Sequence, residues 1–107
     1  MFQLGSTLLE ACVLAVLRRE DSYGYMLTQS IKELVDISES TLYPVLRRLQ
    51  KDGLLTAYDE QYSGRNRRFY RITPRGSEQY EAYVGAWQNY KVKLDLILLG
   101  GIANEQV

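Results

Sequence analysis

The polar residues between positions 40 and 51 are of types that could bind a nucleic acid. Short hydroxyl side chains come first and long cationic side chains follow, at Ser40, Thr41, Tyr43, Arg47, Arg48 and Lys51. A helix in the major groove of DNA uses this order, because short polar groups near its N-terminus read base edges and cations further along meet phosphates. An ordinary amphipathic helix with a solvated charged face has the same composition, so this stretch alone leaves both interpretations open.

The same stretch has the apolar pattern of a helix. Apolar residues recur at the i, i+3, i+4, i+7 spacing of one buried face, at Leu42, Val45, Leu46 and Leu49. Ser38 or Ser40 can cap the N-terminus through a side-chain oxygen, and Gly53 can end the helix in the left-handed conformation. Pro44 removes one backbone donor near the end of the first turn, so we expect a local irregularity there and not a break.

A second group of candidate DNA contacts follows in a predicted hairpin. Between about Leu54 and Thr73 the pattern changes to the alternation of strands, with a turn of moderate length in the middle. The residues expected to contact DNA from the tip are Arg65, Asn66 and Arg67. A hairpin after a recognition helix is the wing of a winged helix, whose arginines can reach phosphates or the minor groove.

The distribution of charge favours a polyanionic partner, although the net charge is zero. Residues 38–76 contain eight cations and four anions, whereas the rest of the chain contains five cations and nine anions. A chain with its cations gathered in one region can present a positive face to DNA.

Composition argues against an enzyme. The 107 residues include no histidine and one cysteine, Cys12, so neither a histidine base nor a thiolate metal site can form, and no glycine-rich phosphate loop is present. We expect no catalytic residue, no metal and no cofactor. A single cysteine and the absence of a long apolar run or a signal peptide predict a cytoplasmic protein that does not enter a membrane.

Two helices are predicted before the candidate recognition helix. The first is capped by Ser6 or Thr7 and runs to about Arg19. The second begins after a cap at Ser22 and has an apolar stripe formed by Tyr23, Leu27, Ile31 and Leu34. A short link at residues 35–38 then joins it to the recognition helix, which is a helix-turn-helix arrangement.

A last helix of about 25 residues is predicted to hold two copies of the chain together. Thr73 is a suitable N-cap, and Pro74 suits the first helical position. Residues 3 and 4 apart then form a heptad seam over residues 77–99, with dimer contacts expected from Tyr80, Trp87, Leu94 and Ile97. The helix is too long for a small body to cover, so a second copy is the simplest partner.

The first half of this seam is aromatic, which suggests a ligand pocket. Large rings that meet across a twofold axis pack poorly and can leave room for a flat aromatic molecule. The expected lining residues are Leu8, Leu9, Cys12, Tyr83, Trp87 and Tyr90. The alternative is that these aromatic rings fill a dry core.

Three segments resemble the PadR family of bacterial transcriptional regulators. They are YGY at 23–25, ESTLYPVLRRLQKDGLL at 39–55 and RRFYRITPRG at 67–76. The resemblance implies a winged helix-turn-helix dimer that binds a palindromic operator and represses transcription. In multidrug-responsive relatives a tryptophan midway along the last helix stacks on planar ligands, and Trp87 occupies the matching place. Lys91 and Gln79 stand where those relatives have assisting carboxylate and amide groups, and members that sense phenolic acids are an equally open comparison.

The predicted fold is therefore mainly α with a small β-hairpin (α+β). Residues 1–75 form a winged helix-turn-helix DNA-binding domain, and residues 76–107 form the dimerisation helix and a tail. The alternative function is a winged helix that only binds other proteins. Such a module has no need of both a basic helix face and a basic wing tip.

Overall fold

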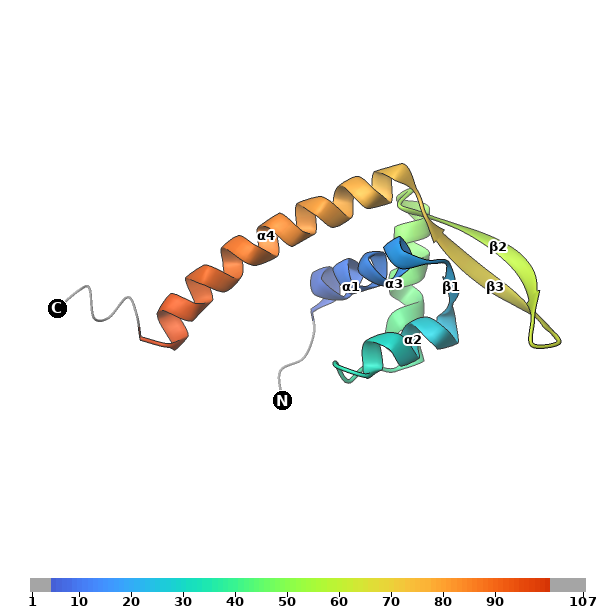
Figure 1. Cartoon of the computed structure of the whole chain (residues 1–107), viewed down its shortest axis with the longest axis horizontal. Coiled ribbons are helices and arrows are strands. Elements are labelled where there is room, and N and C mark those ends of the chain that lie inside the picture. Colours follow the sequence, from blue (N-terminus) through green and yellow to red (C-terminus); the bar gives the residue numbers. More distant parts are fainter. Residues whose placement is uncertain (1–4, 101–107) are drawn as a thin grey trace.

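The structure is a computed structural model and describes residues 5–100. Four helices and three strands follow one another along the chain (Figure 1). They are α1 (Ser6–Arg19), β1 (Ser22–Tyr23), α2 (Gly24–Lys32), α3 (Glu39–Lys51), β2 (Leu55–Tyr62), β3 (Arg65–Ile72) and α4 (Pro74–Leu98). This is the winged helix-turn-helix fold that the sequence predicts, with one additional short strand.

Helix α1 forms one wall of the core. Its residues Leu9, Val13, Leu14 and Leu17 are buried. The predicted serine or threonine cap is wrong, because the helix begins at Ser6 after Gly5 and no side chain caps it. Cys12 packs half-buried against the core, and burial raises the pKa of its thiol. It therefore behaves as a small apolar residue.

The segment before α2 differs from the prediction. Ser22 does not cap α2; it lies in β1 and pairs with Tyr70 of β3, so Tyr23 occupies the N-cap position. Leu34 is 92% exposed because α2 ends at Lys32, two residues earlier. The apolar stripe of α2 therefore ends at Ile31.

Helix α3 has the predicted face and both predicted ends. Its buried residues are Leu42, Val45, Leu46 and Leu49. The Ser38 Oγ accepts a hydrogen bond from the Thr41 N–H at 3.3 Å, and Gly53 has a φ of 78° just beyond the helix. The helix is continuous through Pro44, which lies in the second turn and not in the first.

The wing is a tighter hairpin than predicted. Tyr62 pairs directly with Arg65, so only Ser63 and Gly64 form the turn. Both have positive φ, at 55° and 77°, which is the geometry of the two-residue turn that matches strand twist. Strand β1 adds to the other edge of β3, giving the order β1-β3-β2. This short turn places Arg65 and Asn66 in β3 rather than in a loop.

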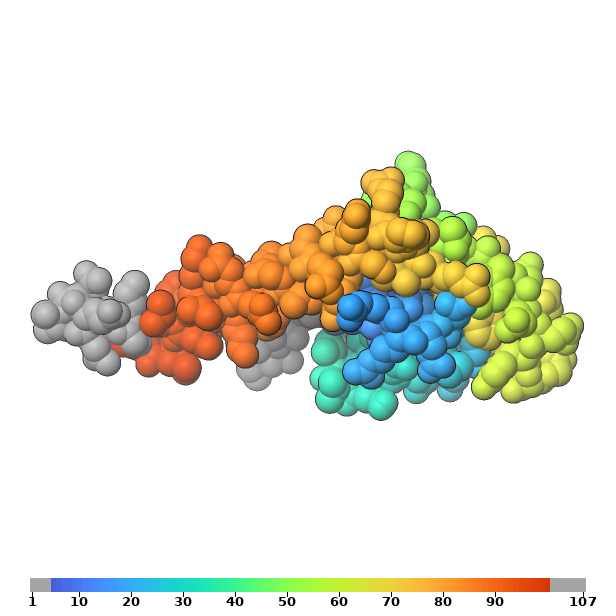
Figure 2. Space-filling view, turned by 45° about the horizontal axis from the view of Figure 1, so that its top comes forward, coloured from blue at the N-terminus to red at the C-terminus, as the bar shows by residue number. Residues whose placement is uncertain are grey.

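Helix α4 starts at the predicted cap and leaves the body. The Gly76 N–H donates to Thr73 Oγ1 at 3.0 Å, and Pro74 is the first helical residue. The first part of α4 packs against α1, whereas its second part projects beyond the body (Figures 1 and 2). The chain is therefore elongated, with extents of 64 × 29 × 20 Å.

Candidate nucleic-acid interface

Three hydroxyl groups gather at the N-terminus of α3. The Ser38 Oγ lies 3.0 Å from Ser40 Oγ and 3.1 Å from Thr41 Oγ1. Ser38, Ser40 and Thr41 are exposed. Hydroxyl groups can donate or accept, so this cluster can hydrogen-bond to base edges or to phosphate oxygens.

Tyr43 lies one turn further along α3 and is held by two neighbours. Its hydroxyl donates to Glu39 Oε2 at 2.6 Å. This hydrogen bond, with a smaller contribution from burial, raises the pKa of Tyr43 to about 12. The ring lies directly over Gly24, where a Cβ atom would stand 2.8 Å from the Tyr43 Oη. Gly24 thus permits close approach between α2 and a side chain of α3.

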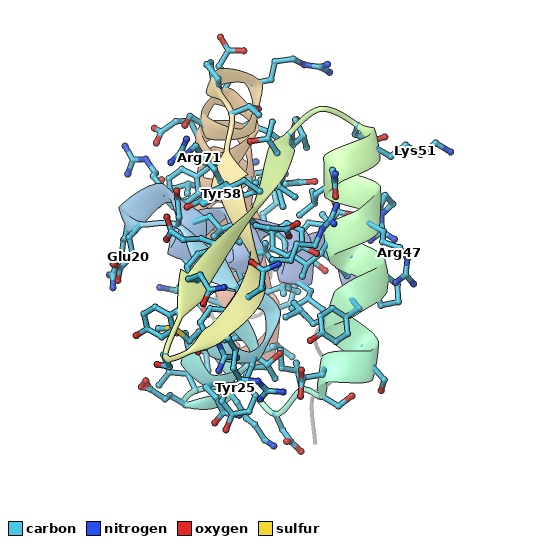
Figure 3. The ribbon with its side chains drawn as sticks, turned by 90° about the vertical axis from the view of Figure 1, so that its right-hand side faces the viewer. Glu20, Tyr25, Arg47, Lys51, Tyr58 and Arg71 are labelled. Atoms are coloured by element: carbon cyan, nitrogen blue, oxygen red, sulfur yellow. The ribbon has the colours of Figure 1, made fainter. Side chains whose placement is uncertain are left out.

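The three cations of α3 divide into two groups. Arg47 and Lys51 are exposed and project outward from the helix (Figure 3). Arg48 instead turns toward α1, where its Nε and Nη2 atoms lie 2.8 and 2.7 Å from Glu10 Oε2. The Arg48 guanidinium is therefore paired with a carboxylate of its own chain, and its contact with phosphate stays a prediction.

The hairpin register decides where the wing arginines lie. Arg65 and Asn66 are exposed beside the tip. Arg67 is half-buried, because its guanidinium lies 4.6 Å from the centroid of the Tyr23 ring and its Nε donates to the Tyr62 carbonyl at 3.2 Å. Arg67 is therefore partly engaged within the wing.

Two residues beside this surface were not predicted as contacts. Tyr25 and Arg68 are exposed and line a hollow of about 260 Å³ between the start of α2, Tyr43 and β3. Strand alternation places Arg68 and Asn66 on the face that continues from the buried Tyr70. Counting back from Tyr70 in steps of two within the predicted strand finds Arg68 on this face from the sequence alone.

Arg71 is engaged on another part of the hairpin. Its Nε and Nη2 atoms lie 2.9 and 2.8 Å from Asp21 Oδ2, which also accepts from Tyr58. Arg71 and Tyr58 lie on the side of the hairpin away from Arg47 and Lys51 (Figure 3). This cluster joins the end of α1 to the wing and leaves the exposed cations on the α3 side.

A separate hollow of about 330 Å³ lies between α1 and α4. It is lined by Thr7, Leu8, Ala11, Tyr83, Ala86, Trp87 and Tyr90. Trp87 is 43% and Tyr90 is 56% exposed, so the hollow opens to solvent. Leu9 and Cys12, predicted to line it, do not: Leu9 is 1% exposed within the core, and Cys12 packs against that core. The aromatic rings therefore do not fill a dry core within one chain.

A larger hollow of about 900 Å³ lies on another side of α1, between α2 and Tyr80. Charges of both signs line it, including Arg18, Glu20 and Glu33, and Tyr80 is its one aromatic lining residue in the described part of the chain. It therefore lacks the aromatic wall of the hollow beside Trp87. Among residues 5–100, no three metal-ligating side chains come together, and no helix is long and apolar enough to cross a membrane.

A helix-turn-helix with a polar, cation-bearing recognition helix and a basic wing defines a winged-helix DNA-binding protein. Residues 13–82 match the family model described as the transcriptional regulator PadR-like family. The chain belongs to this family, whose members are DNA-binding transcription regulators and not enzymes. The absence of catalytic motifs from the sequence agrees with this assignment.

Known relatives support the same conclusion. A transcriptional regulator of Mycobacterium tuberculosis is 46% identical over 55 residues, which cover 50% of this chain and 51% of that protein. A crystal structure from Streptococcus mutans has a TM-score of 0.87 at 37% identity and covers 92% of this chain and 93% of that one. A PadR-like transcriptional regulator from Bacillus cereus has a TM-score of 0.78 at 32% identity, covering 86% and 92%.

Proposed function

We propose that this PadR-family regulator is a cytoplasmic, ligand-responsive repressor that binds a palindromic operator as a homodimer. Residues 1–75 are its DNA-binding domain, and residues 76–107 are its dimerisation helix and tail. The observation that carries the proposal is the arrangement of two surfaces. Helix α3 and the wing, which both have exposed cations, belong to the body of the molecule, while α4 extends its exposed apolar residues away from that body (Figure 1).

The DNA contacts follow from exposure and residue type. Ser40, Thr41 and Tyr43 read bases, because short polar groups near the helix N-terminus reach base edges. Exposed long cations contact phosphates or the minor groove, namely Arg47, Lys51, Arg65 and Arg68. This set adds Arg68 to the cations expected from sequence and leaves out Arg48, which pairs with Glu10, and Arg67, which is engaged within the wing.

Dimerisation through α4 is supported by the apolar surface that one chain leaves uncovered. The exposed residues include Trp87, Leu96, Ile97, Leu98 and Leu99, at 40–78% exposure. Tyr80 packs against its own chain, with the Arg18 guanidinium 4.9 Å from its ring centroid, so the intermolecular seam begins near Trp87. A second α4 can cover this surface and set the two recognition helices about 34 Å apart, one helical turn of DNA.

The hollow beside Trp87 is the proposed effector site. Its aromatic and aliphatic lining suits a planar aromatic molecule, and the Tyr83 and Tyr90 hydroxyls supply polar contacts. Since Trp87 also lies on the seam, an occupant can alter the distance between the recognition helices.

The salt dependence of operator binding tests the proposal against a protein-interaction module. Genomic fragments selected by the protein supply the operator. If each protomer neutralises about four phosphates, log K falls against log salt with a slope of about −7. A slope near zero would remove the DNA proposal and favour the interaction module.

Two arginines of β3 provide a matched pair of variants. Arg65→Ala should weaken binding to all sequences and flatten the slope by about 1. Arg71→Ala removes the same charge from the same strand, but this guanidinium is bound to Asp21 away from α3, so the slope should stay at the parent value. Equal flattening in both variants would reject the assignment of Arg65.

A further inference from the structure

One carboxylate of α1 links the DNA-reading helix to the wall of the aromatic hollow. Glu10 Oε2 lies 2.7 Å from Nη2 of Arg48, which belongs to α3, and accepts a hydrogen bond from Nε of the same residue at 2.8 Å. Glu10 Oε1 accepts the hydroxyl of Tyr83 from α4 at 2.7 Å. Each oxygen therefore holds a different helix.

This bridge is shielded from solvent on the Glu10 side. The Glu10 side chain is only 16% exposed, whereas that of Arg48 is 42% exposed. Burial, together with the hydrogen bond to Glu10, raises the pKa of Tyr83 to about 12, so its hydroxyl remains a donor at neutral pH. A partly buried carboxylate depends on such donors, because water cannot fully replace a lost one.

The two partners of Glu10 belong to the two proposed functional surfaces. Arg48 follows Arg47 directly on α3, next to the outward-facing cations. Tyr83 lines the aromatic hollow one turn before Trp87, and Ala11, the residue after Glu10, lines it too. A molecule that enters the hollow must therefore touch the ring whose hydroxyl Glu10 holds.

We propose that Glu10 is a positioning residue that couples occupancy of the aromatic hollow to the orientation of α3 on DNA. An occupant that displaces the Tyr83 ring removes one donor from Glu10. The carboxylate can then move together with the Arg48 guanidinium, and this movement changes the polar contact between α1 and α3. Coupling of this kind is reciprocal, so operator binding must lower the affinity of the hollow for its occupant by the same factor. This inference depends on the proposed function for both surfaces.

An ion pair elsewhere between α1 and α4, the helices that the Glu10–Tyr83 hydrogen bond joins, supplies the control. Arg18 of α1 and Glu81 of α4 approach to 3.6 Å, with side chains 54% and 65% exposed. Glu81 is not among the residues that line the aromatic hollow. Glu81→Gln therefore removes an α1–α4 charge contact without touching the bridge.

The test uses 1-pyrenesulfonate, a planar aromatic anion that DNA phosphates repel. Quenching of Trp87, the only tryptophan, gives the dissociation constant of the dye. The anisotropy of labelled operator gives the dissociation constant of the operator with and without saturating dye. We call the quotient of these two constants the coupling ratio. We expect the dye to weaken operator binding of the parent and of Glu81→Gln by about fivefold or more. In Tyr83→Phe and Glu10→Gln the ratio should fall to near 1 although the dye still binds.

A dye-free measurement separates this inference from the effector site. In a double-mutant cycle on operator affinity, Tyr83→Phe and Arg48→Lys should interact by more than about twofold, since both act through Glu10. An absence of interaction overturns the inference, as does a parent-like ratio in Tyr83→Phe with bound dye. If the dye neither quenches Trp87 nor affects operator binding, the effector site fails, and the cycle still decides the role of Glu10.

Discussion

At the scale of single residues, the most informative contact joins Gly24 to Tyr43. Any Cβ at position 24 would collide with the Tyr43 ring, which is the far end of a movable, partly exposed side chain. The ring can swing away at little cost to the fold, but its hydroxyl would then leave Glu39. We therefore expect Gly24 to affect the position of Tyr43, a proposed base contact, more than it affects stability.

We predict that Gly24→Ala keeps the free energy of unfolding within about 1 kcal/mol of the parent, because alanine favours a helix. Operator affinity should fall about tenfold, the value of one good base contact. Urea unfolding and operator anisotropy measure the two effects. Adding Gly24→Ala to Tyr43→Ala should cause no further loss of affinity; an additional loss would mean that Gly24 acts without Tyr43.

Asp21 predicts a dependence of stability on pH. Burial raises the pKa of this carboxyl, but hydrogen bonds from Tyr58 and Arg71 outweigh that effect and hold the pKa below its ordinary value of 3.8. A lowered folded-state pKa gives stability that is present above the unfolded pKa and is lost as the pH falls through the folded pKa.

Asp21→Asn should therefore be less stable than the parent at pH 7, and the difference should shrink below about pH 3.8. Urea unfolding at a series of pH values checks this expectation. Asp59→Asn, at an exposed aspartate of β2, is the control. A difference that stays constant down to pH 2 would show that charge is not the cause.

At the scale of elements, the joint between the wing and α4 depends on one glycine. Gly76 is buried in the first turn of α4, against the Leu54 carbonyl oxygen. A Cβ there would clash with that backbone atom and stand 2.7 Å from Ile72 Cγ1. Backbone cannot move aside as a side chain can, so α4 approaches the sheet this closely only with glycine.

Gly76→Ala should lower the free energy of unfolding by about 1–3 kcal/mol, the usual cost of overpacking. Gly85, in the same helix, has open space around it. Gly85→Ala should instead raise stability by about 0.5–1 kcal/mol. Urea unfolding of both variants makes the comparison; a loss of stability in Gly85→Ala would indicate that a partner packs on this position.

At the scale of the whole molecule, the length of α4 determines the expected assembly. Most of its second half lies beyond the body, and its large apolar residues there are exposed. Leu94→Asp combined with Ile97→Asp should convert a dimer into single chains of 12.4 kDa in sedimentation velocity, since two carboxylates would be buried in the seam.

Val92→Asp provides the control for this substitution. Val92 is similarly exposed on α4 but lies off the seam, so its change should leave the dimer intact. An unchanged mass for the Leu94 and Ile97 variant would reject the α4 seam. Dissociation by Val92→Asp as well would indicate a different interface on this helix.

The sequence by itself determined the recognition helix, a serine cap at Ser38 or Ser40, the Gly53 end and the start of α4. These features depend on side chains within a few residues of one another, and local hydrogen bonding and apolar periodicity decide them. It also predicted the family and the polar face of α3. It missed β1, because two residues pair with β3 only once the hairpin exists.

Tertiary structure decided which exposed charged residues are paired within the chain. Arg47 and Arg48 are adjacent and chemically identical, yet α1 brings Glu10 to Arg48 from 38 positions away. Likewise, the two-residue turn sets which residue of β2 lies opposite each residue of β3, and it extends β3 back to Arg65 and Asn66. A one-residue change of register reverses every side chain of a strand, and local sequence does not contain the contacts that select between the two faces.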